Sequence, residues 1–287
     1  MSTEARLTRT DSMAPEVAER LASAVGPGRR FEGGDLLPAL WHWAYFPELA
    51  PLAELGPDGH PRRDDELAER FPRRMAGGGR VQQLRGLVVG EPAEKLSEIV
   101  EMREHHGRSG DLVVCQWRHT YLQSGATALE EMQSLVYLPA RTEEQRPASP
   151  GAPAGAAPPT AQGSWEVVRH VEFSSVALFR FSAATWNSHR IHYDRGYATG
   201  EEGYPGLVVH GPLLTMLLAR EAERELGSSL TLEFRSKAAV FDGEGVDVYI
   251  LREDDTSCLL EARKPDGTVT TALSASIASG PGGEPGP

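Results

Sequence analysis

Residues 181–216 read FSAATWNSHRIHYDRGYATGEEGYPGLVVHGPLLTM and place a polar, histidine-bearing loop directly before an apolar run. The loop carries His189 and His192, and the apolar run continues into the charged segment AREAERE. That pattern predicts a buried helix whose first turn holds His210 and Gly211. Backbone N–H groups at a helix start point outward and favour negative charge. Histidines beside it are therefore candidates for proton transfer next to a developing anion.

The composition is typical of a soluble globular protein of one large or two moderate domains. The chain has 287 residues, of which 40% are hydrophobic and 24% charged, and its formal net charge is −12. That acidic balance argues against a nucleic-acid partner and against an anionic membrane surface. It leaves room for a phosphate-bearing ligand such as CoA, which needs only a few local basic side chains.

The cysteines and the apolar stretches indicate a cytoplasmic location. Cys115 and Cys258 lie in strand-like runs, so we expect two buried free thiols and no disulfide framework. The N-terminal residues are polar and mixed in charge, without the apolar core of a signal peptide. The apolar run near 206–219 is interrupted by His, Gly and Pro and is too short to span a bilayer.

A Pro/Ala/Gly-rich segment, residues 141–163, divides the chain into halves of similar size. Its residues cannot bury enough apolar surface to offset the entropy of ordering, which predicts a flexible linker. We expect an N-terminal extension over 1–30, a first domain over 31–140, a second over 164–279 and a disordered tail over 280–287.

The two halves have the pattern of distant repeats. Each ends in short strand-like runs joined by tight turns, which predicts antiparallel sheets, and the two cysteines fall at equivalent points. In the second half a long helix precedes these strands. In the first half, the aromatic-rich residues 36–46 are expected to begin the equivalent helix, and a long insertion, 47–79, follows. Such insertions serve either as lids and pocket walls or as cover for a sheet edge.

The segment quoted above resembles the signature of the MaoC-like hydratase/dehydratase family of the hotdog fold. In words, that signature is an aromatic residue and Ser, then Gly-Asp-x-Asn-Pro-x-His, and later a hydrophobic pair before His-Gly. The runs FSA (181–183), IHYD (191–194) and VVHG (208–211) match it. The middle departs, because Trp186 stands where the family has Gly and Asn187 where it has the catalytic Asp.

In the same loop His189 stands where the family has Asn, and Arg190 where it has Pro. This altered form is similar to a subgroup with two hotdog domains, which contains mesaconyl-C4-CoA and itaconyl-CoA hydratases and fungal mitochondrial dehydratases. The first half is similar to that subgroup through residues 36–46 and GPDGHPRR (56–63). The resemblance implies an α+β tandem double hotdog, in which a curved antiparallel sheet wraps a long helix in each half and a degenerate first half enlarges the acyl pocket.

The resemblance implies reversible hydration or dehydration of an acyl thioester, without a metal or a redox cofactor. His192 would remove the proton from Cα, because an imidazole with a pKa of about 6.5 exchanges protons near neutral pH. The enolate oxygen would be held at Gly211, where a missing side chain lets a carbonyl approach backbone N–H groups. The alternatives are a histidine that satisfies the loop backbone and a glycine needed for helix packing.

Three further residues of this region are candidates for contact with the reactants. Asn187 cannot exchange protons but can orient water, or it serves only as a turn residue. His189, three residues before His192, is either a second proton-handling group or an exposed loop histidine. His210 is expected to contact substrate. A zinc site built from His189, His192 and His210 is the metal-binding alternative, although no Cys or Glu accompanies the HxxH spacing.

In the first half, Trp41 and Trp43 belong to an aromatic stripe that either lines the acyl pocket or packs in the core. Arginines of the insertion could meet CoA phosphates or a substrate carboxylate, or remain solvated. The expected partners are an acyl-CoA or acyl-carrier-protein thioester and a second copy of the chain in a homodimer. Two other classes of function remain open, a non-catalytic acyl-thioester-binding subunit and a hotdog thioesterase.

Overall fold

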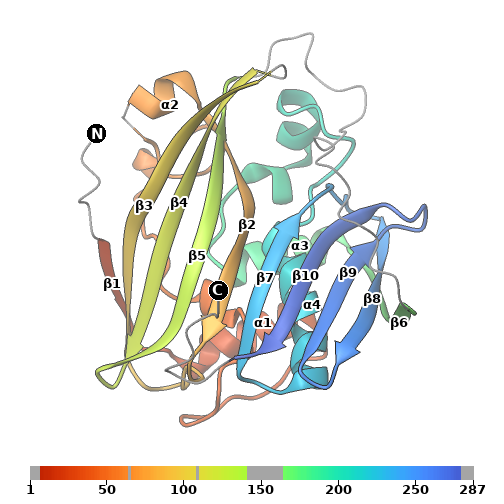
Figure 1. Ribbon diagram of the computed structural model, residues 1–287. Helices are drawn as coiled ribbons and strands as arrows, with labels where there is room; N and C mark the ends of the chain where they lie inside the picture. The colour runs from red at the N-terminus through yellow and green to blue at the C-terminus, as the bar shows by residue number, and fades with distance from the viewer. Residues whose placement is uncertain (1–6, 64–65, 108–109, 141–163, 279–287) are drawn as a thin grey trace.

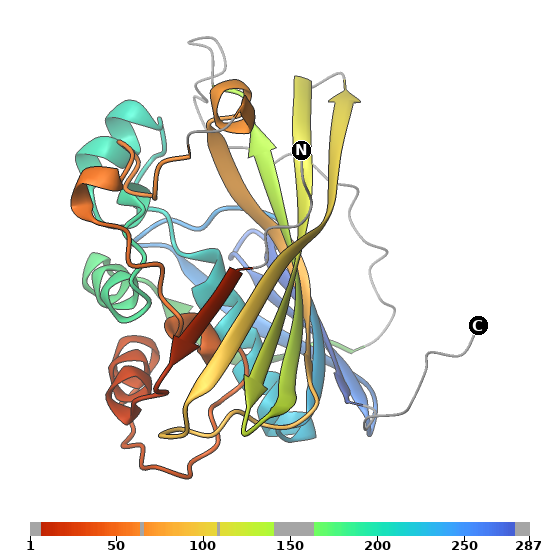
Figure 2. The same cartoon turned by 90° about the vertical axis from the view of Figure 1, so that its left-hand side faces the viewer.

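In the computed structural model, ten antiparallel strands form one sheet, and the helices pack against one of its faces (Figures 1 and 2). The structure describes residues 7–63, 66–107, 110–140 and 164–278. The predicted linker, 141–163, and the predicted tail, 280–287, lie outside these residues. Within the described ranges, no helix is long and apolar enough to cross a membrane.

The first half contributes five strands and short helices. Their bounds are β1 Leu7–Asp11, α1 Pro15–Val25, 3₁₀ turns Trp41–Ala44 and Leu52–Glu54, α2 Glu66–Arg70, β2 Arg73–Gln83, β3 Ala93–Gly107, β4 Gly110–Gln123 and β5 Ala126–Leu138. The second half contributes five more strands and the longest helix of the described residues. Their bounds are β6 Glu166–Glu172, α3 Ser175–Ala184, a 3₁₀ turn Arg190–His192, a π turn Tyr197–Glu201, α4 Gly211–Leu226, β7 Leu230–Ser236, β8 Gly245–Asp254, β9 Ser257–Arg263 and β10 Val269–Ile277.

The two halves have equivalent strand orders, read outward from the junction between β2 and β7. The order of the whole sheet runs β1-β3-β4-β5-β2 and then β7-β10-β9-β8-β6, so each strand of the first half has a counterpart in the second. Cys115 lies on β4 and Cys258 on the equivalent β9, and both thiols are free and buried. The prediction of two repeated halves, and of a double hotdog, is confirmed.

A glycine run forms the junction between the halves. Strand β2 pairs with β7 from Gly79 opposite Phe234 to Gln82 opposite Thr231. Gly78 has φ +143°, and a Cβ atom there would lie 2.4 Å from the carbonyl oxygen of Phe234. The register of β2 against β5 also shifts at this point, as in a β-bulge. Glycine is therefore needed for the two halves to join into one sheet.

Helix α4 is the buried helix that the sequence predicts. It begins at Gly211 with a proline in its first turn, and it ends at Leu226, before Gly227, whose φ is +90°. Its apolar residues pack against β7, β9 and β10, and Leu218 is fully buried. This packing fixes the helix start, and with it the loop that precedes the helix.

The predicted helix over residues 36–46 is wrong. Only Trp41–Ala44 forms a 3₁₀ turn. Leu40 and Phe46 have positive φ values of 66° and 57°, and Pro47 follows, which disfavours helical backbone at the preceding residue. The equivalent of α4 is thus reduced to one turn in the first half, and α1, which packs against α3, comes earlier in the chain.

Replacing Gly78 by alanine should destabilise the protein, because the added Cβ meets the backbone of β7 in a conformation that L residues rarely adopt. We expect a loss of at least about 2 kcal/mol in the free energy of unfolding, measured by urea denaturation. Gly33→Ala is the control, since a Cβ there meets nothing within 4 Å. Equal stability of the two variants would contradict the assigned role of the junction.

Candidate active site

His192 is buried at the end of residues 185–192, which we call the histidine loop. One nitrogen of its ring contacts the backbone. Its Nδ1 lies 2.7 Å from the carbonyl oxygen of Val208. A carbonyl only accepts hydrogen bonds, so Nδ1 carries the proton and donates it. The backbone N–H of Val208 in turn donates to the carbonyl of Ile191. In the neutral ring Nε2 therefore keeps a free lone pair, as a general base requires.

The ring of His192 is stacked on that of His210, with centroids 3.7 Å apart and planes inclined by 19°. Burial lowers the pKa of His192 to about 4 and holds that of His210 well below its usual range. Two positive charges at this distance would repel each other strongly. Both rings are consequently neutral at pH 7.

His210 precedes α4 and is fully buried, and one of its nitrogens is unsatisfied. Its Nε2 lies 2.8 Å from Oγ of Ser182 on α3. Its Nδ1 has no hydrogen-bond partner within the described part of the chain. A buried polar nitrogen without a partner is costly, and a bound polar group would relieve that cost.

Gly211 is the first residue of α4, and no side chain caps this helix start. The N–H of Gly211 therefore lies at the N-terminal end of the helix dipole. The following residue is proline, which has no N–H to offer. A Cβ on Gly211 would lie 3.2 Å from Oγ of Ser236. A glycine here keeps this approach to the helix open.

Asn187 forms a local turn. Its Oδ1 accepts the backbone N–H of His189 at 3.0 Å, and its own N–H donates to the carbonyl of Ser182 at 2.9 Å. This turn directs the ring of His189 edge-on toward His192, with centroids 5.4 Å apart. The oxygen of Asn187 is thus engaged in shaping the loop, and its amide nitrogen is the atom that remains for a ligand.

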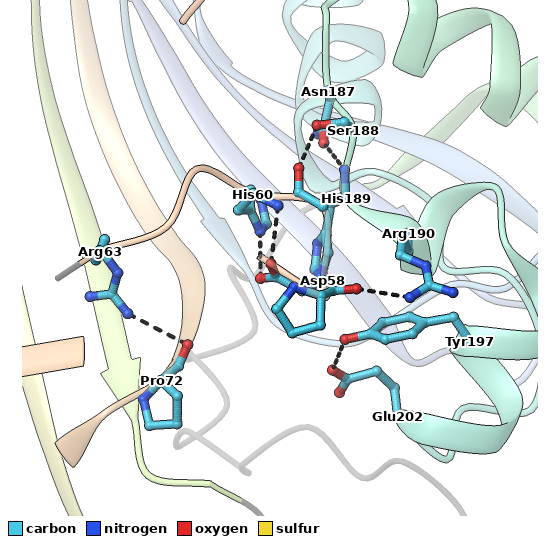
Figure 3. A network of polar contacts seen from close by, with 12 residues as sticks. Asp58, His60, Arg63, Pro72, Asn187, Ser188, His189, Arg190, Tyr197 and Glu202 are labelled. Atoms are coloured by element: carbon cyan, nitrogen blue, oxygen red, sulfur yellow. Dashed lines mark hydrogen bonds and ion pairs between the residues drawn. The ribbon is translucent and has the colours of Figure 1, made fainter. Parts of the chain in front are cut away.

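A loop of the first half lies against the histidine loop, a contact that no local sequence pattern predicts (Figure 3). The ring of His60 lies 4.2 Å from that of His189. Its Nδ1 lies 2.9 Å from Oδ2 of Asp58, and its backbone N–H donates to Oδ1 of the same carboxylate at 3.0 Å. The side chains of His60, His189, His192 and His210 therefore form a row that we call the histidine row.

Backbone contacts fasten the two loops together. The N–H of Arg190 donates to the carbonyl of Asp58 at 2.9 Å, and its guanidinium donates to that of Pro57 at 2.9 Å. Gly59 has φ +90°, and a Cβ there would lie 2.0 Å from the carbonyl oxygen of Ser188. Only glycine allows this approach, so the contact is built into the sequence GPDGHPRR.

The histidine row is electrically neutral at pH 7, and the neighbouring Asp58 carries a negative charge. Burial lowers the pKa of His189 to about 3, with further lowering from its histidine neighbours. Burial also lowers the pKa of His60, more than Asp58 raises it. Burial raises the pKa of Asp58, but hydrogen bonds from His60 outweigh it and bring the pKa to about 2. A carboxylate and neutral imidazoles coexist at pH 7.

Within the described residues, neither Trp41 nor Trp43 makes a ring contact with the histidine row. Trp43 donates its ring N–H to Glu131 at 2.9 Å and packs edge-to-face on Phe234. Trp41 lines a hollow beside Glu223, which lies about 18 Å along α4 from Gly211 at 1.5 Å per residue. The structure thus brings together His192, His189, His210, Asn187 and Gly211, but it does not bring Trp41 to them.

The three histidines considered for zinc do not form a group of close ligand atoms in the described ranges. A closer group is Asp58, His60 and His189, whose ligand atoms lie within 4.8 Å of one another. In it, Nδ1 of His60 and Oδ2 of Asp58 already bond to each other. The donor set is therefore satisfied as a hydrogen-bonded pair.

A double hotdog with a histidine loop over a helix start defines a MaoC-like hydratase/dehydratase. Residues 40–242 match the family model for hydroxyacyl-thioester dehydratase type 2. The chain is 40% identical over 248 residues to mesaconyl-C(4)-CoA hydratase of Chloroflexus aurantiacus, which covers 85% of this chain and 84% of that protein. The chain belongs to the hydroxyacyl-thioester dehydratase type 2 family, and it is a hydro-lyase that acts on acyl thioesters.

Solved structures with the same fold have diverged far in sequence. HtdX of Mycobacterium tuberculosis superimposes with a TM-score of 0.68 at 15% identity, covering 94% of this chain and 99% of that chain. A second protein of that organism, described as a double hotdog, gives a TM-score of 0.56 at 17% identity and covers 96% of each chain. These likenesses support the fold alone.

The buried histidines should make stability depend on pH. Unfolded histidine takes up a proton near pH 6.5, whereas folded His192 does so near pH 4. Its contribution is complete above pH 6.5 and is lost as the pH falls toward 4, by at most about 3 kcal/mol. In His192→Gln, the loss of unfolding free energy between pH 7 and 4.5 should be smaller than in the wild type. His105→Gln, an exposed control, should keep the wild-type loss, and equal losses in all three would contradict the neutral state of His192.

Proposed function

We propose that this protein reversibly hydrates the double bond of a CoA thioester whose acyl group carries a second, free carboxylate. The proposed reaction rests on the free Nε2 of His192 beside the start of α4. The hydrogen bond from Nδ1 to the carbonyl of Val208 leaves that nitrogen unprotonated. The observation that carries the substrate class is the unpaired guanidinium of Arg74 next to this site.

In the dehydrating direction, Nε2 of His192 removes the proton from Cα. The electrons of that bond move into the thioester carbonyl, whose oxygen becomes an enolate. The N–H of Gly211 donates to this oxygen, as at other oxyanion sites. If the hydroxyl of Ser182 donates to Nε2 of His210, then Nδ1 of His210 carries a proton and is a second donor.

The enolate then expels the hydroxyl group from Cβ, and that group leaves as water once it has received the proton that His192 removed from Cα. The amide nitrogen of Asn187 is available to orient the departing or attacking water, since its oxygen is held by His189. In the reverse direction the same groups add water across the double bond. The chain's own residues supply every step in this account.

The free carboxylate would bind at Arg74 of β2. Burial lowers the pKa of this guanidinium, and its charge acts on both His60 and His189. Within the described residues the guanidinium of Arg74 makes no hydrogen bond and no ion pair. A half-buried, unpaired guanidinium is suited to a carboxylate, which it binds through charge-assisted hydrogen bonds. A mesaconyl-C4 thioester, named for the relative above, carries such a carboxylate.

The proposal also covers the thioester carrier, the oligomeric state and the cellular location of the protein. CoA is the carrier we propose, with an acyl-carrier-protein thioester as the alternative. Loss of the enone absorbance without release of free thiol separates this reaction from thioester hydrolysis and from non-catalytic binding. A homodimer and a cytoplasmic location remain predictions, to be checked by light scattering and by cell fractionation.

His192→Ala should abolish most turnover while the fold remains. General acid–base groups contribute about 10²–10⁴ in rate, so we expect a loss of that size in kcat with mesaconyl-type CoA thioesters. The loss should fall on kcat, because the imidazole acts in the transition state. A folded variant that keeps more than about a tenth of the wild-type kcat would exclude His192 as the base.

Arg74→Met should change substrate preference. Losing a charge-assisted hydrogen bond costs about 1.5–3 kcal/mol, so kcat/KM for a mesaconyl-type thioester should fall about 10- to 100-fold. For crotonyl-CoA, which has no second carboxylate, kcat/KM should stay within about three-fold. Arg103→Met, at an exposed arginine of β3, should affect neither substrate. Equal losses on both substrates would contradict carboxylate binding at Arg74.

A further inference from the structure

The histidine loop lacks the carboxylate that the related signature contains. Asn187 occupies its position, and an amide neither gains nor loses a proton near neutral pH. Its oxygen is also held by the backbone of the loop. The reaction nevertheless has two proton transfers, one at Cα and one at the oxygen on Cβ. His192 offers one free nitrogen for both.

A carboxylate–imidazole pair from the other half stands beside this loop. The proton on Nδ1 of His60 is shared with Oδ2 of Asp58 at 2.9 Å, so Nε2 of the neutral ring is left with a lone pair. The second oxygen of Asp58 holds the backbone of His60. The carboxylate thus fixes both the position and the tautomer of the ring, as in other carboxylate–histidine pairs.

The ring of His60 packs against the rest of the histidine row. The ring of His60 lies 4.2 Å from His189, and the charge of His60 also acts on His192. The side chains of Asp58 and His60 are 32% and 21% exposed, which leaves access for a small reactant. The approach of Gly59 to Ser188 sets the spacing and would not survive a larger residue.

We propose that His60, oriented by Asp58, is the second proton-handling group of the reaction, so that the first half completes the active site of the second. This proposal rests on the function proposed above. His60 acts on the oxygen at Cβ, and His192 acts on Cα.

The proton balance closes without an added reactant. In hydration, Nε2 of His60 takes a proton from water as the oxygen bonds to Cβ, and the π electrons move into the thioester carbonyl. The carboxylate of Asp58 stabilises the resulting imidazolium. The proton then passes to Nε2 of His192 and on to Cα, where it forms the new C–H bond, and both rings end neutral. His189, between the two rings, is placed to carry it.

The charges around His60 suit a base that is neutral at rest. Asp58 raises its pKa, whereas burial and the guanidinium groups of Arg63 and Arg74 lower it. A carboxylate bound at Arg74 would offset part of that positive charge when substrate is present. The pair would then accept a proton more readily in the complex than in the free enzyme.

The test compares variants of the full chain in the enone-absorbance assay with a mesaconyl-type CoA thioester. His60→Asn removes Nε2 but keeps a side-chain N–H that can reach Asp58. His60→Gln is the second variant, in case the first does not fold. We expect kcat to fall by about 10² or more in either, with KM within about three-fold of the wild type.

Asp58→Asn should lower kcat by at least about ten-fold, because the imidazolium loses its counter-charge. The same change removes the influence that raises the pKa of His60, so the acidic limb of the pH–rate profile should move to lower pH. The double variant Asp58→Asn/His60→Asn should be no slower than His60→Asn, because the two residues act as one unit. A purely structural pair would not move the pH profile.

His170→Gln is the matched control, since the exposed His170 of β6 forms a similar pair with Asp247 of β8 at 2.7 Å. It should retain wild-type kcat. Three results would overturn the proposal: a folded His60→Asn or His60→Gln with more than about a tenth of wild-type kcat, a loss confined to KM, or loss of wild-type activity on treatment with EDTA, which would indicate a metal. If the wild type is inactive, or if His192→Ala is active, the proposed function itself fails. If His192→Ala is inactive but His60→Asn is not, this inference alone fails.

Discussion

The hydrogen bond from Nδ1 of His192 to the carbonyl of Val208 is the contact on which the site depends. It joins the histidine loop to the residues before α4, and it can form only when the helix start is in place. It also sets the tautomer, because a ring that donates from Nδ1 presents a bare Nε2. Burial then keeps that ring neutral at pH 7, as its proposed role of general base requires.

The two halves share one sheet but have different tasks. The second half keeps the buried helix α4, whose unsatisfied first turn faces the histidine loop. In the first half the equivalent helix is reduced to the turn Trp41–Ala44, and an insertion follows it. That insertion supplies the loop of Asp58 and His60. The first half has thus lost its long helix, and its insertion forms a wall against the histidine loop of the second half.

Local sequence patterns predicted the main helix and the repeated halves. Features that depend on contacts between distant parts of the chain could not be predicted. The periodicity after Gly206 predicted α4, and the spacing of turns predicted the repeat, because each depends on neighbours in sequence. The contact of Gly59 with Ser188 joins residues 129 apart and leaves no local pattern. The helix expected at 36–46 failed because positive φ at Leu40 and Phe46 is not visible in apolar character.

The state of His192 is the central claim, and ¹⁵N NMR of the imidazole nitrogens in the folded protein tests it most directly. We expect a neutral ring with the proton on Nδ1 at pH 7, which stays neutral to about pH 5. A proton on Nε2, or titration near pH 6.5, would contradict it. Either result would mean that the ring is not held as a base beside α4.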